Sequence, residues 1–404
     1  MALIFPFRAL RPISTSAARV AAVPYDVVNA QEAHALADGN PLSFLHVSRA
    51  EIDLPPNTDP YSDAVYRKAV DNFEALKAEA PLVAEGAPSM YVYRLKMGNH
   101  VQTGVAATFS IDEYESGTIR KHEHTRRDKE DDRTRHMIAL RAQTGPVFLT
   151  YRAAPPLDAA VSRIAKQAPL FDFTAVDGVQ HTMWRAEEQD TKALIDAFAA
   201  VPRMYIADGH HRAASAARAR QQLGAGGVHG EWDTVLAVAF PDNQMQVLPY
   251  NRVVKDLGAH SPASLLAALR QLFTVKDGPA APARKGEVAM FLDGGWHTIV
   301  LGEVPASLQA ADRLDVSRLQ QTVLSPLLGI GDVRTDKRID FVGGARGTSE
   351  LEALVRSGRF AVAFSMYPVS VEDLMQVCDA GGIMPPKSTW FEPKLRDGLL
   401  SHVI

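Results

Sequence analysis

The sequence DGHHR at 208–212 brings an acid, a glycine, two histidines and an arginine together. The apolar run at 203–207 predicts a short buried strand, and the alanine-rich run that ends at Gly224 predicts a helix. The two histidines and the arginine would then lie in the first turn of this helix, after a tight turn at the Asp-Gly pair. Cationic side chains there are unfavourable by ~0.3–1 kcal/mol each unless an anion is bound. The cluster therefore predicts an anion site, such as a site for phosphate.

Two other interpretations of this cluster stay open. A zinc site usually draws on histidines four residues apart on a helix, whereas adjacent His210 and His211 point apart. The cluster could also be a plain turn, with Asp208 as a cap and two incidental histidines. In the functional interpretation, Gly209, His210, His211 and Arg212 hold a phosphate chain, and Asp208 binds Mg²⁺ or orients a histidine. Asp208 and the two histidines are also catalytic candidates.

The segment 119–136 is almost wholly ionisable, with seven Lys or Arg, five Asp or Glu and three His. Asp131 lies four residues after Arg127 and four before Arg135, which predicts an exposed, salt-bridged helix from Thr125 onward.

The residues just before this helix follow a predicted strand, at an edge where a rigid scaffold often presents catalytic groups. Glu123 is a candidate general base for a hydroxyl nucleophile, provided that burial or a nearby charge tunes its pKa. His122 and Thr125 beside it are candidate substrate ligands.

Further candidates lie among prolines or at a strand end, in "FPFRALRP", "VPYDVV" and "LPYNRVV". A charged residue in a stiff segment can line a site, although a surface turn explains it equally well. The substrate ligands predicted in these segments are Arg8, Tyr25, Asp26 and Arg252.

Near the end, "GGIMPPKSTWFEPKLRDG" gathers lysines and hydroxyls after a Gly-Gly and a Pro-Pro. It lacks the pattern of a Walker A loop. One interpretation is a loop that contacts phosphate through Lys387, Ser388 and Thr389. The alternative is a rigid loop with solvated cations.

The chain has 404 residues, a formal net charge of -4 and one cysteine, Cys378. This length suggests two or three domains. The charge gives no reason to expect a protein that coats DNA or a membrane surface, and no apolar run approaches the length of a membrane span. A single cysteine supplies neither a disulfide framework nor a thiolate metal cluster. We therefore expect a cytoplasmic protein that binds neither nucleic acid nor membranes, and the sequence leaves a homo-oligomer open.

The first residues give a competing indication of location. Arg8, Arg11 and Arg19 precede the first acid, as in a mitochondrial transit peptide. However, Pro6 and Pro12 interrupt the amphipathic helix that such a peptide requires.

Strands joined by local turns alternate with helical patterns, which predicts an α+β protein with mixed sheets and several β-hairpins. Hairpin turns are expected at 98–99, 177–178, 241–243 and 293–295. Amphipathic helices are expected at 63–80, 190–201 and 261–273, the last with Ser261 as its N-cap. The segment 277–287 is either a linker or a long loop beside a hairpin.

Taken together, these motifs resemble the bacterial and archaeal family called domain of unknown function 1015. The resemblance runs from Phe5 to about Leu400. The matching segments are "FPFRALRP", "PYDVV", "NPLSFLHVSRAEIDL", "KHEHT", "GPVFLTY", "IADGHHR", "LPYNR", "DFVGG" and "MPPKSTWFEPKLRDGLL". Together these segments are very specific to that family, but they say little about activity.

The "IADGHHR" segment is also similar to one in the free serine kinases of the ParB/sulfiredoxin-like superfamily. These enzymes phosphorylate free L-serine, with ADP as donor in the archaeal type, and the superfamily binds a nucleotide phosphate at a Gly-x-x-Arg turn. The matching residues here are Gly209, His210, His211 and Arg212. The resemblance implies a ParB/sulfiredoxin-like core with N- and C-terminal extensions, which we divide as 1–95, 96–258 and 259–404.

Together with the anion site, this resemblance implies a nucleotide-dependent phosphotransferase for a small hydroxy amino acid, namely free L-serine or O-phosphoserine. The co-substrate would be ADP or ATP and the cofactor Mg²⁺. Glu123 would take the serine proton, and Lys387 and Ser388 would close over the transferring phosphate. One alternative is a phosphoserine phosphatase. Another is a non-catalytic nucleotide-binding regulator of the ParB type.

Overall fold

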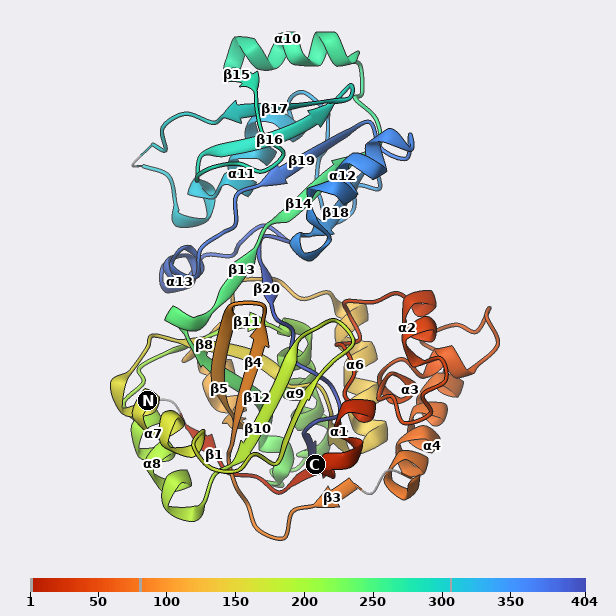
Figure 1. Cartoon of the computed structure of the whole chain (residues 1–404), viewed down its shortest axis with the longest axis vertical. Coiled ribbons are helices and arrows are strands. Elements are labelled where there is room, and N and C mark those ends of the chain that lie inside the picture. The colour runs from red at the N-terminus through yellow and green to blue at the C-terminus, as the bar shows by residue number, and fades with distance from the viewer. Residues whose placement is uncertain (1–2, 80–81, 306) are drawn as a thin grey trace. The chain divides into compact units, whose positions relative to one another are not determined.

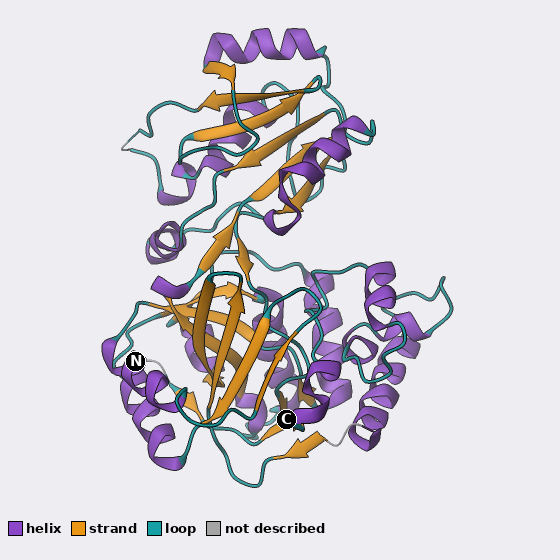
Figure 2. Cartoon of the chain, in the orientation of Figure 1, coloured by secondary structure: helices purple, strands orange, loops and turns teal. Residues whose placement is uncertain are grey.

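The computed structural model describes residues 3–79, 82–305 and 307–404 (Figures 1 and 2). The chain forms two compact units. The first unit comprises Met1–Lys121, Thr125–Met245 and Pro393–Ile404, and the second unit comprises His122–His124 and Gln246–Glu392. Among the described residues, no helix has both the length and the apolar character needed to cross a membrane. The division into three segments expected from the sequence stays a prediction.

The first unit is built on a mixed sheet of nine strands, in the order β6-β11-β8-β12-β5-β4-β10-β9, with β1 paired to β5. Its strands are β1 (Ile4–Phe5), β4 (Tyr91–Met97), β5 (His100–Ser110), β6 (Ile119–Arg120), β8 (Val147–Tyr151), β9 (Phe171–Thr174), β10 (Gln180–Arg185), β11 (Met204–Asp208) and β12 (Thr234–Pro241). The pairs β6/β11 and β8/β12 are parallel and the other pairs are antiparallel.

A smaller sheet of four strands, in the order β3-β2-β21-β7, joins the two ends of the chain. Its strands are β2 (Ala9–Pro12), β3 (Leu82–Ala84), β7 (Ala142–Gln143) and β21 (Ser401–Val403). Because β2 pairs with β21, the C-terminal segment is an integral part of the first unit.

Helices and short 3₁₀ turns complete the first unit. They are α1 (Ser14–Val20), α2 (Ala30–Ala37), α3 (Leu45–Ser48), η1 (Ala50–Asp53), α4 (Asp63–Glu79), α5 (Ile111–Ser116), α6 (Arg127–Leu140), α7 (Pro155–Ile164), α8 (Glu188–Phe198), α9 (His210–Leu223), η2 (Glu231–Asp233) and η3 (Asp242–Gln244). The predicted apolar face of α4 is confirmed, since Val65, Ala69, Phe73 and Leu76 are all buried. Five buried alanines allow α9 to pack closely against α6 and the sheet.

Helix α6 forms where the sequence predicts a charged helix, but the predicted ion pairs within it are wrong. Asp131 pairs with Arg218 of α9, and Arg135 lies 2.5 Å from Asp63 of α4, instead of pairing with residues four positions away. The reason is that α6 packs against both α4 and α9, so its charges meet partners on neighbouring helices. The helix is also less exposed than expected, since Asp132 and His136 are buried.

The second unit contains a sheet of six strands in the order β15-β17-β16-β19-β14-β18, and a separate ladder of β13 with β20. Its strands are β13 (Gln246–Leu248), β14 (Tyr250–Val254), β15 (Thr274–Asp277), β16 (Glu287–Leu292), β17 (Gly295–Val300), β18 (Ile339–Gly343), β19 (Val362–Met366) and β20 (Trp390–Glu392). Its helical segments are α10 (Pro262–Leu272), η4 (Ala310–Arg313), α11 (Asp315–Leu319), η5 (Gln320–Leu324), η6 (Gly344–Arg346), α12 (Gly347–Arg356) and α13 (Val371–Asp379).

Three of the four predicted hairpins are confirmed: β4/β5, β9/β10 and β16/β17. The last one turns at Asp293 and Gly294, which both have the positive φ that this tight turn requires. The hairpin expected at 241–243 is wrong, because β12 pairs within the first unit whereas β13 pairs with β20. Segment 277–287 is a loop inside the second unit, and Ser261 caps α10 as predicted. The α+β class with several mixed sheets is confirmed.

Candidate functional site

The turn between β11 and α9 is the centre of the candidate site. Strand β11 lies between β6 and β8, and it ends at Asp208. Gly209 follows with φ 92°, a left-handed conformation that glycine adopts without strain, and it serves as the N-cap of α9. Because glycine has no side chain, it gives the helix no side-chain cap. The first turn of α9 contains no acidic residue.

The carboxylate of Asp208 is held on both of its oxygens. Oδ1 accepts from the backbone N–H of Gly209 at 2.8 Å, and Oδ2 accepts from Nζ of Lys394 at 2.9 Å. Arg212 lies 3.9 Å from the same carboxylate. Burial would raise the pKa of Asp208, but Lys394 and Arg212 hold it well below its usual range. Asp208 is therefore an anion that is already neutralised by its neighbours.

Arg212 is buried, with 7% of its surface exposed. Its Nη1 donates to the carbonyl of Pro146, and its Nε has no hydrogen-bond partner in the described part of the chain. Burial would lower the pKa of Arg212, but the carboxylates of Asp26, Asp208 and Asp397 raise it. The guanidinium thus lies in an acidic environment and keeps one N–H donor unused by the protein.

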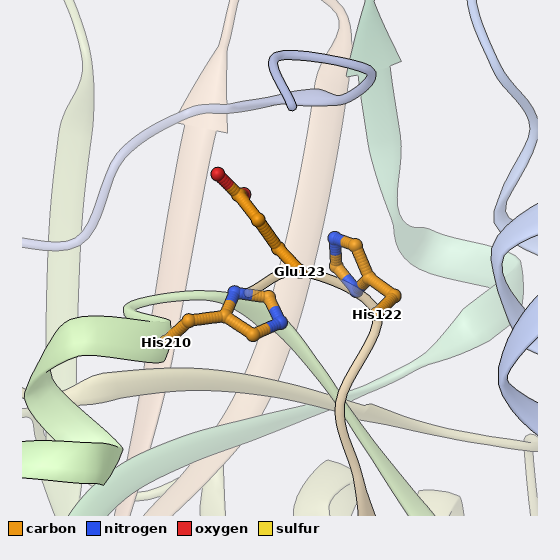
Figure 3. A group of neighbouring side chains, drawn as sticks. All are labelled: His122, Glu123 and His210. Carbon is orange, nitrogen blue, oxygen red and sulfur yellow. The ribbon is translucent and has the colours of Figure 1, made fainter. Parts of the chain in front are cut away.

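The loop 122–124 follows β6, the parallel neighbour of β11. Figure 3 shows His122 and Glu123 of this loop, and His210 in the first turn of α9. His122 and His210 are both buried.

The residues just after this loop contact the start of α9 within the first unit. The backbone N–H of Arg126 donates to Nε2 of His211 at 3.1 Å, so this ring nitrogen carries no proton. The hydroxyl of Thr125 donates to the carboxylate of Glu130 in α6. The ring of His211 is therefore oriented by a contact with Arg126, which the spacing within DGHHR does not predict.

Glu123 and His124 also line a cavity of about 330 Å³ within the second unit. Its other walls are formed by Ala311, Asp312, Ser317, Asp332, Arg334, Ile383, Met384, Pro385 and Pro386. Asp332 and Arg334 form an ion pair at 2.6 Å. The residues that line the cavity thus include three acids and one arginine.

The segment with Lys387 and Ser388 lies in the second unit, beside Arg252. Arg252 is buried, and its Nη2 donates to the carbonyl of Lys387 at 3.1 Å. Lys387 has a φ of 58°, which is unusual for a residue with a side chain. Its ammonium lies 5.5 Å from the ring centre of Tyr250. Ser388 donates to the carbonyl of Pro385 at 2.6 Å.

The model of the family described as "Protein of unknown function (DUF1015)" matches residues 4–317 of this chain. The chain belongs to this family. The resemblance seen in the sequence motifs is thereby confirmed.

Comparison of this DUF1015 member with curated proteins by sequence gives no match. Its fold is similar to that of C-terminally truncated SbnI from Staphylococcus aureus, at 14% identity and a TM-score of 0.40, over 74% of this chain and 87% of that one. A conserved hypothetical protein from Pyrococcus furiosus is similar at 15% identity and a TM-score of 0.36, over 74% and 95%. A free serine kinase in complex with AMP is similar at 14% identity and a TM-score of 0.35, over 73% and 92%.

In the DUF1015 chain, the predicted site residues fall into separate groups. Tyr25 and Asp26 lie close enough to Arg212 to raise its pKa, although burial opposes them. Arg8 is exposed and belongs to the surroundings of Glu231. The predicted site residues that belong to the second unit are His122, Glu123, Arg252, Lys387, Ser388 and Thr389.

The sequence did not single out Arg133 and Asp397, which share the buried environment of Tyr25 and Arg212. The guanidinium of Arg133 lies 4.2 Å from the ring centre of Tyr25. Asp397 is 3% exposed, and a Cβ added to Gly145 would lie 2.8 Å from its Oδ1. No local spacing relates these residues, because they lie far apart in the sequence.

Gly209→Ala is expected to destabilise the protein more than the same substitution at another glycine with positive φ. A Cβ at Gly209 would lie 2.9 Å from Nε of Arg212, in addition to the strain of positive φ. At Gly226, which has φ 85°, a Cβ meets nothing within 4 Å. Gly226→Ala should therefore cost about 1–2 kcal/mol from strain alone, and Gly209→Ala a further ~1 kcal/mol or more. Urea unfolding measures both. Equal losses would show that Arg212 moves aside freely.

Proposed function

We propose that this protein transfers a phosphoryl group between a nucleotide, ADP or ATP, and a small hydroxy amino acid, free L-serine in the first instance. The observation that carries the proposal is the first turn of α9, where His210, His211 and Arg212 follow an N-cap without a side chain and no acid is present. Such a helix terminus presents backbone N–H groups and a positive dipole to an anion. We further propose that the core of the chain is ParB/sulfiredoxin-like.

In this proposal, Gly209, His210, His211 and Arg212 hold the phosphate chain of the nucleotide. The unused Nε–H of Arg212 is suited to one phosphate oxygen. Lys387, Ser388 and Thr389 are proposed as further phosphate ligands. Positioning and charge neutralisation account for most of the catalysis in phosphoryl transfer, so such a set of donors is what the reaction needs.

Glu123 is the proposed general base, and the cavity that it lines is of a size for a small acceptor. The hydroxyl oxygen of serine forms a bond to the terminal phosphorus, and the bond from that phosphorus to the nucleotide's bridging oxygen breaks. The hydroxyl proton passes to Glu123. The products are O-phosphoserine and the nucleotide shortened by one phosphate. His122, Thr125, Arg8, Tyr25, Asp26 and Arg252 are proposed to contact the acceptor.

The Mg²⁺ predicted for Asp208 does not fit the carboxylate as it is held. Both oxygens already accept hydrogen bonds, and one of the donors is the ammonium of Lys394 at 2.9 Å. A second cation at the same oxygen would be repelled by that ammonium. No step of the proposed reaction is therefore routed through a metal at Asp208.

Phosphorus NMR tests the proposed reaction. Purified protein is given ADP or ATP with L-serine, and separately O-phosphoserine alone or with AMP. A phosphoserine signal that depends on serine supports the transferase. Release of inorganic phosphate from phosphoserine alone would make the protein a phosphatase instead. Nucleotide that binds but returns unchanged in every mixture would point to a regulatory nucleotide-binding protein of the ParB type.

Glu123→Gln is expected to lower turnover by about 100-fold or more, because the amide cannot accept the serine proton. Nucleotide affinity, measured by calorimetry, should stay as in the wild type. The matched control is Glu303→Gln, an exposed glutamate of the second unit that lies outside the site. Full activity of Glu123→Gln would show that the base is another group.

A further inference from the structure

A second polar cavity, separate from the residues discussed so far, lies within the first unit and has a volume of about 310 Å³. Its walls include a guanidinium, a carboxylate, a phenol, two hydroxyls and an amide. The residues that line it are Arg94, Val101, Thr103, Tyr151, Asp158, Val161, Ser162 and Gln244. This volume is at the lower end of the range for small-molecule sites, so a small ligand is indicated.

The carboxylate of Asp158 lies in the first turn of α7 and is half-buried. Within residues 3–79, 82–305 and 307–404, no hydrogen bond or ion pair to this carboxylate is found. Burial raises the pKa of Asp158. Asp158 is thus a negative charge on a cavity wall that the protein itself leaves unpaired.

Tyr151 contributes a hydroxyl to the same cavity. Its side chain is 1% exposed, and its ring packs 5.3 Å from that of Phe198. Its hydroxyl makes no hydrogen bond to any other described residue. Burial and the negative charges of Asp158 and Asp242 raise its pKa, so the hydroxyl keeps its proton and can donate it to a ligand. On the wall of the cavity, this hydroxyl is open to a ligand.

Arg94 provides the opposite charge. Its Nε donates to Oγ1 of Thr103 at 3.2 Å, and its guanidinium carbon lies 4.9 Å from the ring centre of Trp184. These two contacts orient the side chain. In the described portion of the protein, Arg94 forms no ion pair with a carboxylate, not even with Asp158 on the same cavity. The remaining N–H groups of its fork suit a carboxylate ligand.

The strand register separates this cavity from the β11–α9 turn. Asp208 lies opposite Phe148 near the start of β8, whereas Tyr151 is the last residue of that strand. Three residues of extended chain span roughly 10 Å. A small molecule in the cavity is therefore in a different place from one bound at the first turn of α9.

One small cavity carries a carboxylate and a guanidinium that form no ion pair among the described residues, together with a tyrosine hydroxyl. From this set we propose that the cavity is a second binding site, and that it takes a free α-amino acid. The ammonium group of the ligand binds Asp158, the carboxylate binds Arg94, and its polar side chain is recognised by Tyr151, Ser162 or Gln244. A zwitterion satisfies both charges at once, which neither a simple cation nor a simple anion does. This proposal does not rest on the phosphotransferase function.

The test is thermal stabilisation of the purified full-length protein by each of the twenty free amino acids at concentrations up to roughly 50 mM, with Kd then measured by calorimetry. At least one amino acid should raise the melting temperature. Asp158→Asn and Arg94→Gln should each weaken its Kd by about tenfold or more, because each removes a charged hydrogen-bond partner. The control Asp196→Asn, an exposed residue of α8, should leave Kd unchanged.

Gly209→Ala separates this site from the proposed phosphate site, because it alters the β11–α9 turn and leaves the cavity intact. It should bind the amino acid with the Kd of the wild type. If no amino acid stabilises the protein, the cavity holds water only and the proposal is wrong. If Gly209→Ala weakens binding while Asp158→Asn does not, the amino acid binds at the turn, and the second site is likewise excluded.

Discussion

Arg212→Ala lowers the free energy of unfolding by about 3–5 kcal/mol, the cost of breaking a buried ion pair by removing one partner. Arg212 is buried, and the carboxylates of Asp26, Asp208 and Asp397 surround it. Without the guanidinium, Asp208 keeps the ammonium of Lys394 as its one cationic partner among the described residues. The loss is therefore far larger than for an arginine on the surface.

Arg218→Ala is the matched control, because Arg218 lies in the same helix and also pairs with two acids, Glu130 and Asp131. Its side chain is 29% exposed, so the pair is solvated. The expected cost is below about 1 kcal/mol. Urea unfolding followed by circular dichroism measures both variants. Similar losses in the two would contradict the view that Arg212 is the buried counter-charge of this acidic cluster.

The proposed role of Arg212 as a phosphate ligand needs a variant that stays folded. Arg212→Lys keeps the positive charge but loses the planar fork and its Nε–H donor. We expect it to bind ADP at least about tenfold more weakly than the wild type, from the loss of a charged hydrogen bond. Calorimetry on the folded variant measures this directly. Unchanged affinity would restrict Arg212 to a structural role.

Local features of the fold were predictable from the sequence because their causes are local. The pair Gly98 and Asn99 marks a tight turn between two β-rich runs, and the hairpin β4/β5 forms there. The four apolar residues of α4 recur at helical spacing and are buried together. The Asp-Gly pair at 208–209 gave both the end of β11 and the start of α9. In each case neighbours in sequence decide the geometry.

Interactions between distant segments were not predictable in this way. Lys394 reaches Asp208 across 186 positions of the chain, and no spacing rule relates them. The strand after 241–243 reads like half of a hairpin, yet its partner β20 begins at Trp390. The charges of α6 have i,i+4 neighbours of opposite sign, but tertiary packing supplies closer partners. The sequence therefore predicts only part of the candidate site. Its turn is local, whereas its counter-charges Asp26, Lys394 and Asp397 come from segments near the two ends of the chain.

Asp397→Asn is expected to stabilise the protein at neutral and higher pH while leaving it nearly unchanged in acid. Burial raises the pKa of Asp397 to about 7, although Arg212 opposes this. Its backbone is fixed by hydrogen bonds in both directions with Ala22, and its Oδ1 has no partner among the described residues. The side chain is buried, so the carboxylate ionises away from water.

The sign follows from where the proton binds. Between a pKa near 4 in the unfolded chain and about 7 in the folded chain, the folded state holds more protons, so stability falls as pH rises. The stability that the proton on Asp397 contributes is fully present below pH ~4 and is lost by pH ~7. Asparagine has the same shape and does not ionise. The advantage of the variant should grow by about 1.4 kcal/mol per pH unit within that window, up to roughly 4 kcal/mol.

Unfolding by urea at several pH values from about 5 to 8 measures this difference. Asp177→Asn is the control, because the pKa of Asp177 is shifted in the opposite direction. Burial would raise this pKa, but Arg396 lowers it below its usual value. Asp177 is therefore ionised in both states throughout this range, and the difference between its variant and the wild type should be independent of pH. A flat difference for Asp397→Asn as well would mean that Asp397 is ionised in the folded protein at pH 5. The effect of Arg212 on the pKa of Asp397 would then outweigh that of burial. Asp397 would carry a permanent negative charge within the buried cluster.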